Sequence, residues 1–221
     1  MTAVTRLARR DFTRGLAAGL GVFALGGCDS KSPWHAIDIS GSLPPLAFAM
    51  TRASDGKAVT AADYRGGITM VYFGYTNCPD VCPTTLANLA EILKRLGPLA
   101  GRVRVLFVTV DPNRDSLATL KSYAALFAPQ IDGLRGTDDA IAALARRYRV
   151  VYSVEPATKD HPYEVTHSAA VYVFDATGAA RLLVPSLAST TPDIAGTVAD
   201  LRRLIDENHA PGFIARIMNL V

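Results

Sequence analysis

The sequence of 221 residues predicts an α/β fold built as one folded domain. Two runs rich in β-branched residues, 68–73 and 103–110, have the length and composition of central strands. Apolar residues recur at helical spacing between these runs, and a strand–turn–strand pattern followed by a further helix appears later in the chain. Strands that alternate with helices in this way favour a sheet covered by helices.

A β-hairpin is predicted before the first central strand. Residues 43–50 form an extended edge segment, because Pro44 and Pro45 exclude both a helix and a central strand. The turn residues 55–57 separate this segment from a second short strand at 58–59. The hairpin therefore leads into the core strand.

A helix follows the first central strand, over residues 84–93 and beyond. Pro83 suits its first position, where the missing N–H costs nothing. Residues Gly97 and Pro98 end it. One buried face is expected from apolar side chains at helical spacing, namely Leu86, Leu89, Ala90, Leu93 and Leu96.

The second half of the chain predicts two helices, a hairpin and a closing helix, at residues 116–127, 137–148, 169–184 and 192–207. Thr137 is a good N-cap for the second of these helices. The resulting order is strand, helix, strand, helix, helix, hairpin, helix, with two cysteines before the first helix. This is the thioredoxin arrangement. We therefore predict a thioredoxin-like fold decorated by an N-terminal β-hairpin and one inserted helix.

The first 27 residues match an export signal. Arginines near the start precede the uncharged apolar run 15–27, which is shorter than the about 20 residues that a transmembrane helix needs. Residues 25–28 (Leu-Gly-Gly-Cys) resemble the bacterial lipobox, in which cleavage exposes a cysteine that carries lipid. An incidental Cys28 after a generic signal peptide is the alternative. Arg9 and Arg10 also resemble a twin-arginine signal.

These patterns predict an exported lipoprotein anchored through Cys28 and facing the periplasm or the cell exterior. Residues 1–27 would be the signal peptide, 28–42 the lipid-anchored tether, 43–208 the folded domain and 209–221 a C-terminal tail. The signal segment alone accounts for the formal net charge of +3, so the remainder is balanced. A nucleic-acid partner is not expected, because its basic footprint is missing.

Cys78 and Cys82 stand where the first central strand gives way to a helix. Unpaired backbone N–H groups and the helix dipole favour negative charge there, so we expect both thiols to have lowered pKa values. With Cys28 used as the anchor, one close pair remains in the exported domain, which indicates a working site. Helical geometry would place the two Cα atoms about 6 Å apart, close enough for a disulfide and open enough for one metal ion.

A histidine would complete a metal site, and the chain has four. His35 lies in the predicted tether, His209 in the tail and His161 in a turn. His167 comes just before the strand predicted at 169–174, where the loop of a thioredoxin-like fold packs against the dithiol. Thioredoxins place a proline in this loop and this chain does not. His167 is therefore the predicted third ligand.

Three segments carry a resemblance to a known family: 73–83 with both cysteines, 110–115 (Val-Asp-Pro-Asn-Arg-Asp) and 166–168 (Thr-His-Ser). In their order and spacing, the chain resembles the Sco/SenC family of cytochrome c oxidase assembly factors that handle copper. Asn77 stands where many members have histidine, at a position that is not a family ligand.

The resemblance implies a copper metallochaperone. Copper, as Cu(I) and also as Cu(II), would be bound by Cys78, Cys82 and His167. It would be delivered to the binuclear copper centre of cytochrome c oxidase during assembly. The implied partners are the copper-bearing oxidase subunit, an upstream copper donor protein and the membrane that holds the anchor.

Two alternatives remain open at this point. Cys78 and Cys82 could act as a thiol–disulfide oxidoreductase that keeps the copper-site cysteines of the oxidase reduced. Their wide spacing and the missing proline argue against a general reductant. Zinc is the alternative metal, although a structural zinc site takes four protein ligands and only three convincing candidates exist.

Overall fold

The computed structural model describes residues 33–160, 163–185 and 187–209. The predicted signal peptide, the predicted lipid anchor Cys28, the turn residue His161 and the tail after residue 209 lie outside these ranges. Within the described ranges, no helix combines the length and the apolar character needed to cross a membrane.

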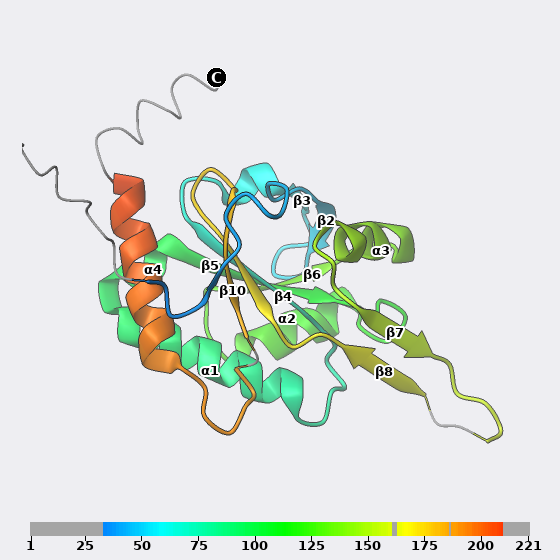
Figure 1. Ribbon diagram of the computed structural model, residues 1–221. Helices are drawn as coiled ribbons and strands as arrows, with labels where there is room; N and C mark the ends of the chain where they lie inside the picture. The colour runs from blue at the N-terminus through cyan, green and yellow to red at the C-terminus, as the bar shows by residue number, and fades with distance from the viewer. Residues whose placement is uncertain (1–32, 161–162, 186, 210–221) are drawn as a thin grey trace, which may run out of the picture. The chain divides into compact units, whose positions relative to one another are not determined.

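An eight-stranded sheet forms the centre of the described residues (Figure 1), in the order β1-β10-β9-β4-β5-β6-β2-β3. The strands β4 (Ile68–Gly74) and β5 (Val103–Thr109) are parallel neighbours, and every residue of β4 is buried. On its other side β4 pairs antiparallel with β9 (Val171–Phe174), which forms a hairpin with β10 (Ala180–Val184). The predicted thioredoxin-like core is confirmed.

Two helices, α1 (Val81–Leu96) and α4 (Ile194–His209), pack together on this core. The helix α1 begins before the predicted start, so Pro83 occupies the third helical position rather than the first. Proline is tolerated there because the first four N–H groups of a helix have no partner inside it. Gly97, with φ of 60°, ends α1 as predicted, and a 3₁₀ turn (Gly97–Arg102) leads into β5.

The strand β6 (Ile131–Arg135) was not predicted from the sequence. It pairs parallel with β5, and α2 (Leu117–Ala125) packs against it. Gly133 permits this packing, because a Cβ there would lie 3.0 Å from the Cβ of Leu120. The next helix, α3 (Asp138–Arg147), has Thr137 as its N-cap, as predicted.

The predicted N-terminal hairpin is present as β2 (Ala49–Arg52) and β3 (Ala58–Thr60), and β2 pairs with β6. A short 3₁₀ turn (Ala61–Tyr64) follows it. The described part of the predicted tether differs from expectation, because β1 (Ile37–Asp38) pairs with β10. This polar stretch joins the sheet through backbone hydrogen bonds, which require no apolar pattern.

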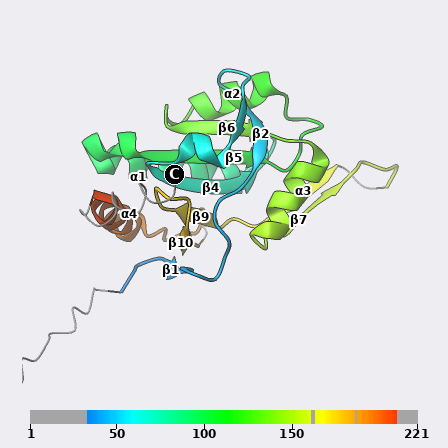
Figure 2. The ribbon, with the colours of Figure 1, turned by 90° about the horizontal axis from the view of Figure 1, so that it is seen from above.

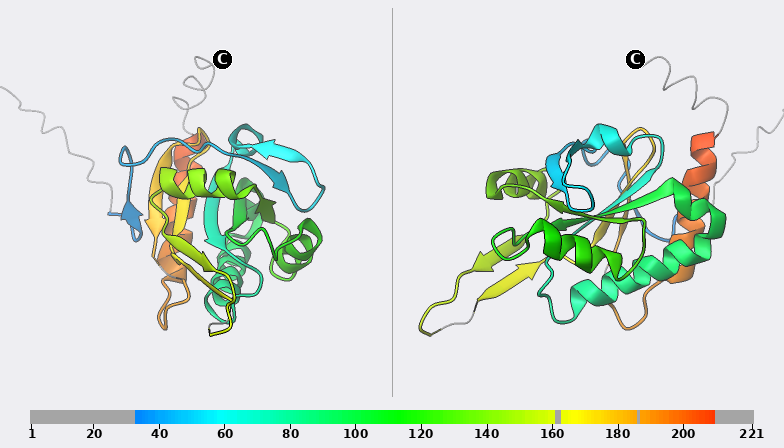
Figure 3. Two further views of the ribbon diagram at one scale, coloured as in Figure 1. Left: turned by 90° about the vertical axis from the view of Figure 1, so that its right-hand side faces the viewer. Right: turned by 180° about the vertical axis from the view of Figure 1, so that it is seen from behind.

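A second, two-stranded sheet is also absent from the prediction. It consists of β7 (Tyr152–Glu155) and β8 (Glu164–His167), paired antiparallel. The two strands project beyond the central sheet, at the end opposite α4 (Figures 1, 2 and 3). Only Val165 among their residues is buried, so the alternating pattern of a half-buried strand is missing from the sequence. His167 therefore ends a strand and does not lie in a loop.

Candidate metal centre

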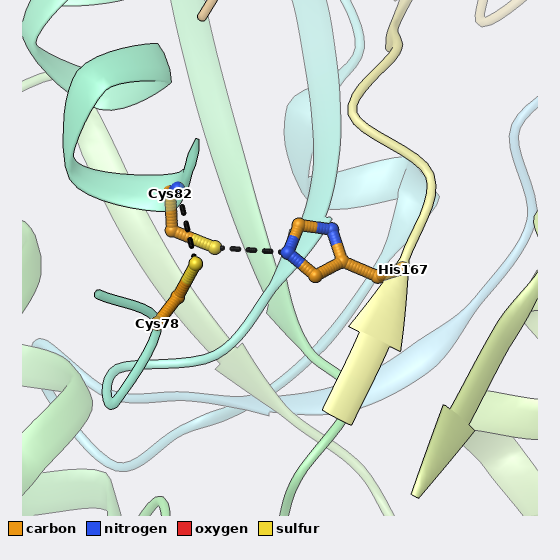
Figure 4. Close-up of side chains that lie close together, drawn as sticks. All are labelled: Cys78, Cys82 and His167. Atoms are coloured by element: carbon orange, nitrogen blue, oxygen red, sulfur yellow. Dashed lines mark hydrogen bonds between the residues drawn. The ribbon is translucent and has the colours of Figure 1, made fainter. Parts of the chain in front are cut away.

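The two cysteines flank the N-terminus of α1 (Figure 4). Cys78 lies in the loop before the helix and is partly exposed, whereas Cys82 lies in the first turn and is fully buried. The backbone N–H of Cys82 donates a hydrogen bond to the Cys78 sulfur at 3.3 Å. Both thiols are free in this structure. The first N–H groups of a helix have no partner inside the helix, and here the Cys78 sulfur accepts a hydrogen bond from one of them.

His167 reaches the thiols from the end of β8 (Figure 4). Its Nε2 lies 3.2 Å from the Cys82 sulfur. The sulfurs of Cys78 and Cys82 and a ring nitrogen of His167 all lie within 4.8 Å of one another. The structure therefore brings together the three predicted ligands, which come from a loop, a helix and a separate hairpin.

The tautomer of His167 follows from its second contact. Its Nδ1 lies 3.1 Å from the carbonyl oxygen of Ser168, and a carbonyl can only accept a hydrogen bond. The tautomer that satisfies this contact carries its proton on Nδ1 and leaves the lone pair of Nε2 directed at the Cys82 sulfur. Burial lowers the pKa of His167, so the ring is neutral at neutral pH. A neutral imidazole whose other N–H binds a carbonyl is the usual form of a histidine ligand.

The predicted lowering of both thiol pKa values is wrong for Cys82. Burial raises the pKa of the Cys82 thiol to about 12, and the contacts with Tyr75 and Tyr72 offset this effect only in part. The hydroxyl of Tyr72 donates to the Cys82 sulfur at 3.6 Å. Such a thiol keeps its proton at neutral pH, so a metal must displace that proton in order to bind.

Two tyrosines enclose the histidine. The rings of Tyr72 and Tyr75 meet the His167 ring edge-on, with centroids 6.0 Å and 5.8 Å away. Tyr72 is fully buried and Tyr75 is almost so. The site opens to solvent through a depression of about 280 Å³. Its lining includes Cys78 and His167 together with Pro79, Asp80, Val81 and Val165.

The loop 111–115 forms hydrogen bonds with the loop that carries Cys78. Asp115 is fully buried and accepts hydrogen bonds from both the N–H and the hydroxyl of Thr76, in the loop that carries Cys78. An aspartate directly before a helix can cap it through its side-chain oxygen. The cap of α2 is instead Ser116. These contacts of Asp115 leave no recognisable pattern in the sequence.

The other histidines within the described ranges lie elsewhere, since His209 is the last residue of α4 and not part of the predicted tail, and His35 lies near the start of the same helix. Nδ1 of His35 lies 3.4 Å from an Asp193 carboxylate oxygen, on a half-exposed surface near the start of α4. Among the described residues, only Cys78, Cys82 and His167 form a group of metal-binding type.

Comparison with known proteins agrees with this geometry. The SCO1/SenC family pattern matches residues 46–205, which include the three candidate ligands. The chain belongs to the SCO1/SenC family. It is 41% identical over 125 residues to the mitochondrial SCO2 homologue of cattle, Bos taurus, covering 56% of this chain and 47% of that protein. A mouse SCO2 homologue is 35% identical over 167 residues, covering 73% and 66%. The chain thus spans about half to two thirds of these relatives.

Solved structures of SCO1/SenC proteins share the fold. ScoI of Bradyrhizobium japonicum, solved with copper bound, has a TM-score of 0.64 and 38% identity, covering 72% of this chain and 98% of that one. Apo Sco1 of Thermus thermophilus has a TM-score of 0.68 and 30% identity, covering 79% and 99%. This SCO1/SenC protein is therefore similar to structures with and without copper.

Proposed function

We propose that this SCO1/SenC protein binds one copper ion through Cys78, Cys82 and His167 and passes it to the binuclear copper centre of cytochrome c oxidase. The observation that carries the proposal is the convergence of two sulfurs and one imidazole nitrogen within 4.8 Å. Two thiolates and an imidazole form a soft donor set, which suits Cu(I) and also accepts Cu(II). A relative at 38% identity was solved with copper bound.

Copper is the cargo in this proposal, so release matters as much as binding. Cys78 is partly exposed at the mouth of the site, whereas Cys82 is buried. An incoming thiolate or imidazole from the copper-bearing oxidase subunit would therefore replace Cys78 first. The ligands would then be exchanged one at a time, and copper would never be free in solution. An upstream donor would load the site by the reverse exchange.

Anaerobic titration of the reduced protein with Cu(I), against a competing chelator, tests the proposal. We expect one Cu(I) per chain and an affinity that falls about 100-fold in His167→Ala, because even the hydrogen-bond partners of metal ligands are worth about 10–100-fold in metal affinity. His35→Ala is the matched control, because His35 lies outside the site, and it should bind like the wild type. An unchanged affinity in His167→Ala would refute the three-ligand site.

Thiol–disulfide exchange is the second candidate function. Cys78 is the accessible thiol and Cys82 the resolving one, so the pair could reduce a disulfide between the oxidase copper-site cysteines. Complementation of oxidase activity in cells separates the two functions. Redox work predicts failure of Cys78→Ser and Cys82→Ser with survival of His167→Ala. Copper transfer predicts that all three variants fail.

We further propose that Cys28 carries lipid and holds the protein at a membrane, with the domain outside the cytoplasm. The proposal rests on the signal-like residues 1–27 and on the lipobox-like residues 25–28. Metabolic labelling with a fatty-acid analogue tests it. Label should appear in the wild type and disappear in Cys28→Ala, while Cys78→Ala keeps it.

A further inference from the structure

We propose that Asp111, Arg114 and Tyr163 form a latch that positions His167 against the two cysteines. None of the three residues belongs to the ligand group, and the latch acts on copper binding only through the position of the hairpin. The inference rests on the proposed copper site and adds to it a determinant of affinity that lies outside the ligands.

The need for a latch follows from where His167 lies. It ends β8, which among the described strands pairs with β7 alone, and this pair is separate from the sheet that carries the cysteine loop. A two-stranded hairpin is marginally stable by itself in water. The distance between His167 and Cys82 therefore depends on whatever fixes the hairpin to the rest of the domain.

Tyr163, directly before β8, supplies a polar attachment in addition to the apolar packing of Val165 in the core. Its hydroxyl donates a hydrogen bond of 2.7 Å to the carboxylate of Asp111, which is fully buried. Arg114 forms an ion pair with the other oxygen of the same carboxylate. The Arg114 guanidinium also stacks on the Tyr163 ring, 3.8 Å from its centroid. The Tyr163 side chain is thus held by Asp111 at its hydroxyl and by Arg114 on one face of its ring.

The same short loop also holds the cysteine side of the site. Asp115 accepts hydrogen bonds from Thr76, and from the Thr109 hydroxyl at 2.6 Å. Arg114 lies 5.7 Å from the ring centroid of Tyr75, the residue that meets His167 edge-on. The loop 111–115 therefore contacts both the loop that carries Cys78 and the hairpin that carries His167.

The loop itself is fixed to the central sheet. Arg135, at the end of β6, donates to the carbonyl oxygen of Pro112 at 2.9 Å and to that of Asp115 at 3.1 Å. The N–H of Asp115 donates to the carbonyl oxygen of Asp111 at 3.0 Å. Because the loop is held to β6 and also binds Tyr163, it fixes the position of the hairpin relative to the central sheet.

A double-mutant cycle on Cu(I) affinity tests the latch. Tyr163→Phe removes the hydroxyl that binds Asp111 and keeps the ring under Arg114. A hydrogen bond to a charged group corresponds to a factor of about ten or more in an equilibrium, so we expect about tenfold weaker binding. In the His167→Ala background the same change should have no effect, because the latch acts through His167. Tyr152→Phe, on the same hairpin, is the control and should bind normally.

A loss of equal size in both backgrounds, or no loss in either, would overturn the latch. A second measurement needs no copper: hydrogen exchange of the reduced apo protein. Tyr163→Phe should speed exchange of the β8 amides and leave those of α4 unchanged. If the wild type binds no copper while this local change is seen, the proposed function fails and the positioning role stands. Unchanged exchange in β8 would count against the latch itself.

Discussion

Gly74 lies directly behind the thiol of Cys82. A Cβ placed on Gly74 would come within 2.7 Å of the Cys82 sulfur and within 2.7 Å of the Phe107 ring. Gly74 ends β4, the buried strand that leads into the cysteine loop. A glycine in a strand often marks a close approach, and here the space that it leaves is filled by a candidate ligand.

Gly74→Ala should therefore disturb both the fold and the site. Because both neighbours are buried, we expect a loss of about 1–3 kcal/mol in the free energy of unfolding, as for other overpacked cores. Cu(I) affinity should also fall, since the Cys82 sulfur must move. Urea denaturation and chelator competition measure the two effects. Gly101→Ala is the control, because a Cβ there meets nothing within 4 Å. Equal stability of the two variants would contradict the close packing.

The two thiols should differ sharply in reactivity. Cys82 is fully buried and its pKa is raised to about 12, so very little thiolate forms at neutral pH. Cys78 is partly exposed. Because the thiolate is the nucleophile, Cys82→Ala should react with iodoacetamide more than about 100-fold faster than Cys78→Ala. Mass spectrometry of the reduced apo variants at pH 7 measures both rates. Similar rates would show that Cys82 is accessible in solution.

The stability of the reduced apo protein should depend on His167 in mild acid. Burial lowers the pKa of folded His167 below its ordinary value of 6.5. Between these two values the unfolded chain binds more protons than the folded one, so stability falls as the pH drops below about 6.5. His167→Gln removes this contribution. Chemical denaturation between pH 5 and pH 8 should therefore give a smaller acid loss for His167→Gln. Identical pH profiles would exclude a buried neutral histidine.

The central strands and helices could be predicted because their residues are constrained by burial. The runs that became β4 and β5 are mostly apolar and are buried at every position except Arg104, and Thr137 marks the start of α3 by its capping chemistry. The strand β6 was missed because Asp132 and Gly133 interrupt its apolar pattern. Gly133 is there for packing against α2 and not for a turn. A central strand can thus carry residues that are poor strand formers.

The three candidate ligands could be identified from the sequence because their spacing indicates local chemistry. Cys78 and Cys82 follow a buried strand, and His167 lies where the hairpin returns to the sheet. The contacts that hold the hairpin beside the cysteines could not be predicted in the same way. Tyr163 meets Asp111 only because β7 and β8 form a separate hairpin, which leaves little pattern in the sequence. The raised pKa of Cys82 likewise depends on burial of the thiol, which the position of a cysteine at a helix start does not reveal.

The segment predicted as a tether should be tightly held from residue 34 onward. The Trp34 ring lies 3.7 Å from the Arg203 guanidinium of α4. Asp200, also in α4 and almost fully buried, accepts hydrogen bonds from the N–H groups of His35 at 3.2 Å and Ala36 at 2.8 Å. Trp34 is the one tryptophan in the chain, so its fluorescence reports on this attachment.

Asp200→Ala should release this segment. Its loss leaves amide groups without their partner, at a cost of about 1–3 kcal/mol, and breaks the link that places Trp34 beside Arg203. The emission of Trp34 should shift to the red as the ring becomes exposed. Asp206→Ala is the control, because Asp206 is exposed on the same helix. If the emission spectra of the two variants match, the segment is not held by Asp200, and a long free tether becomes the better description.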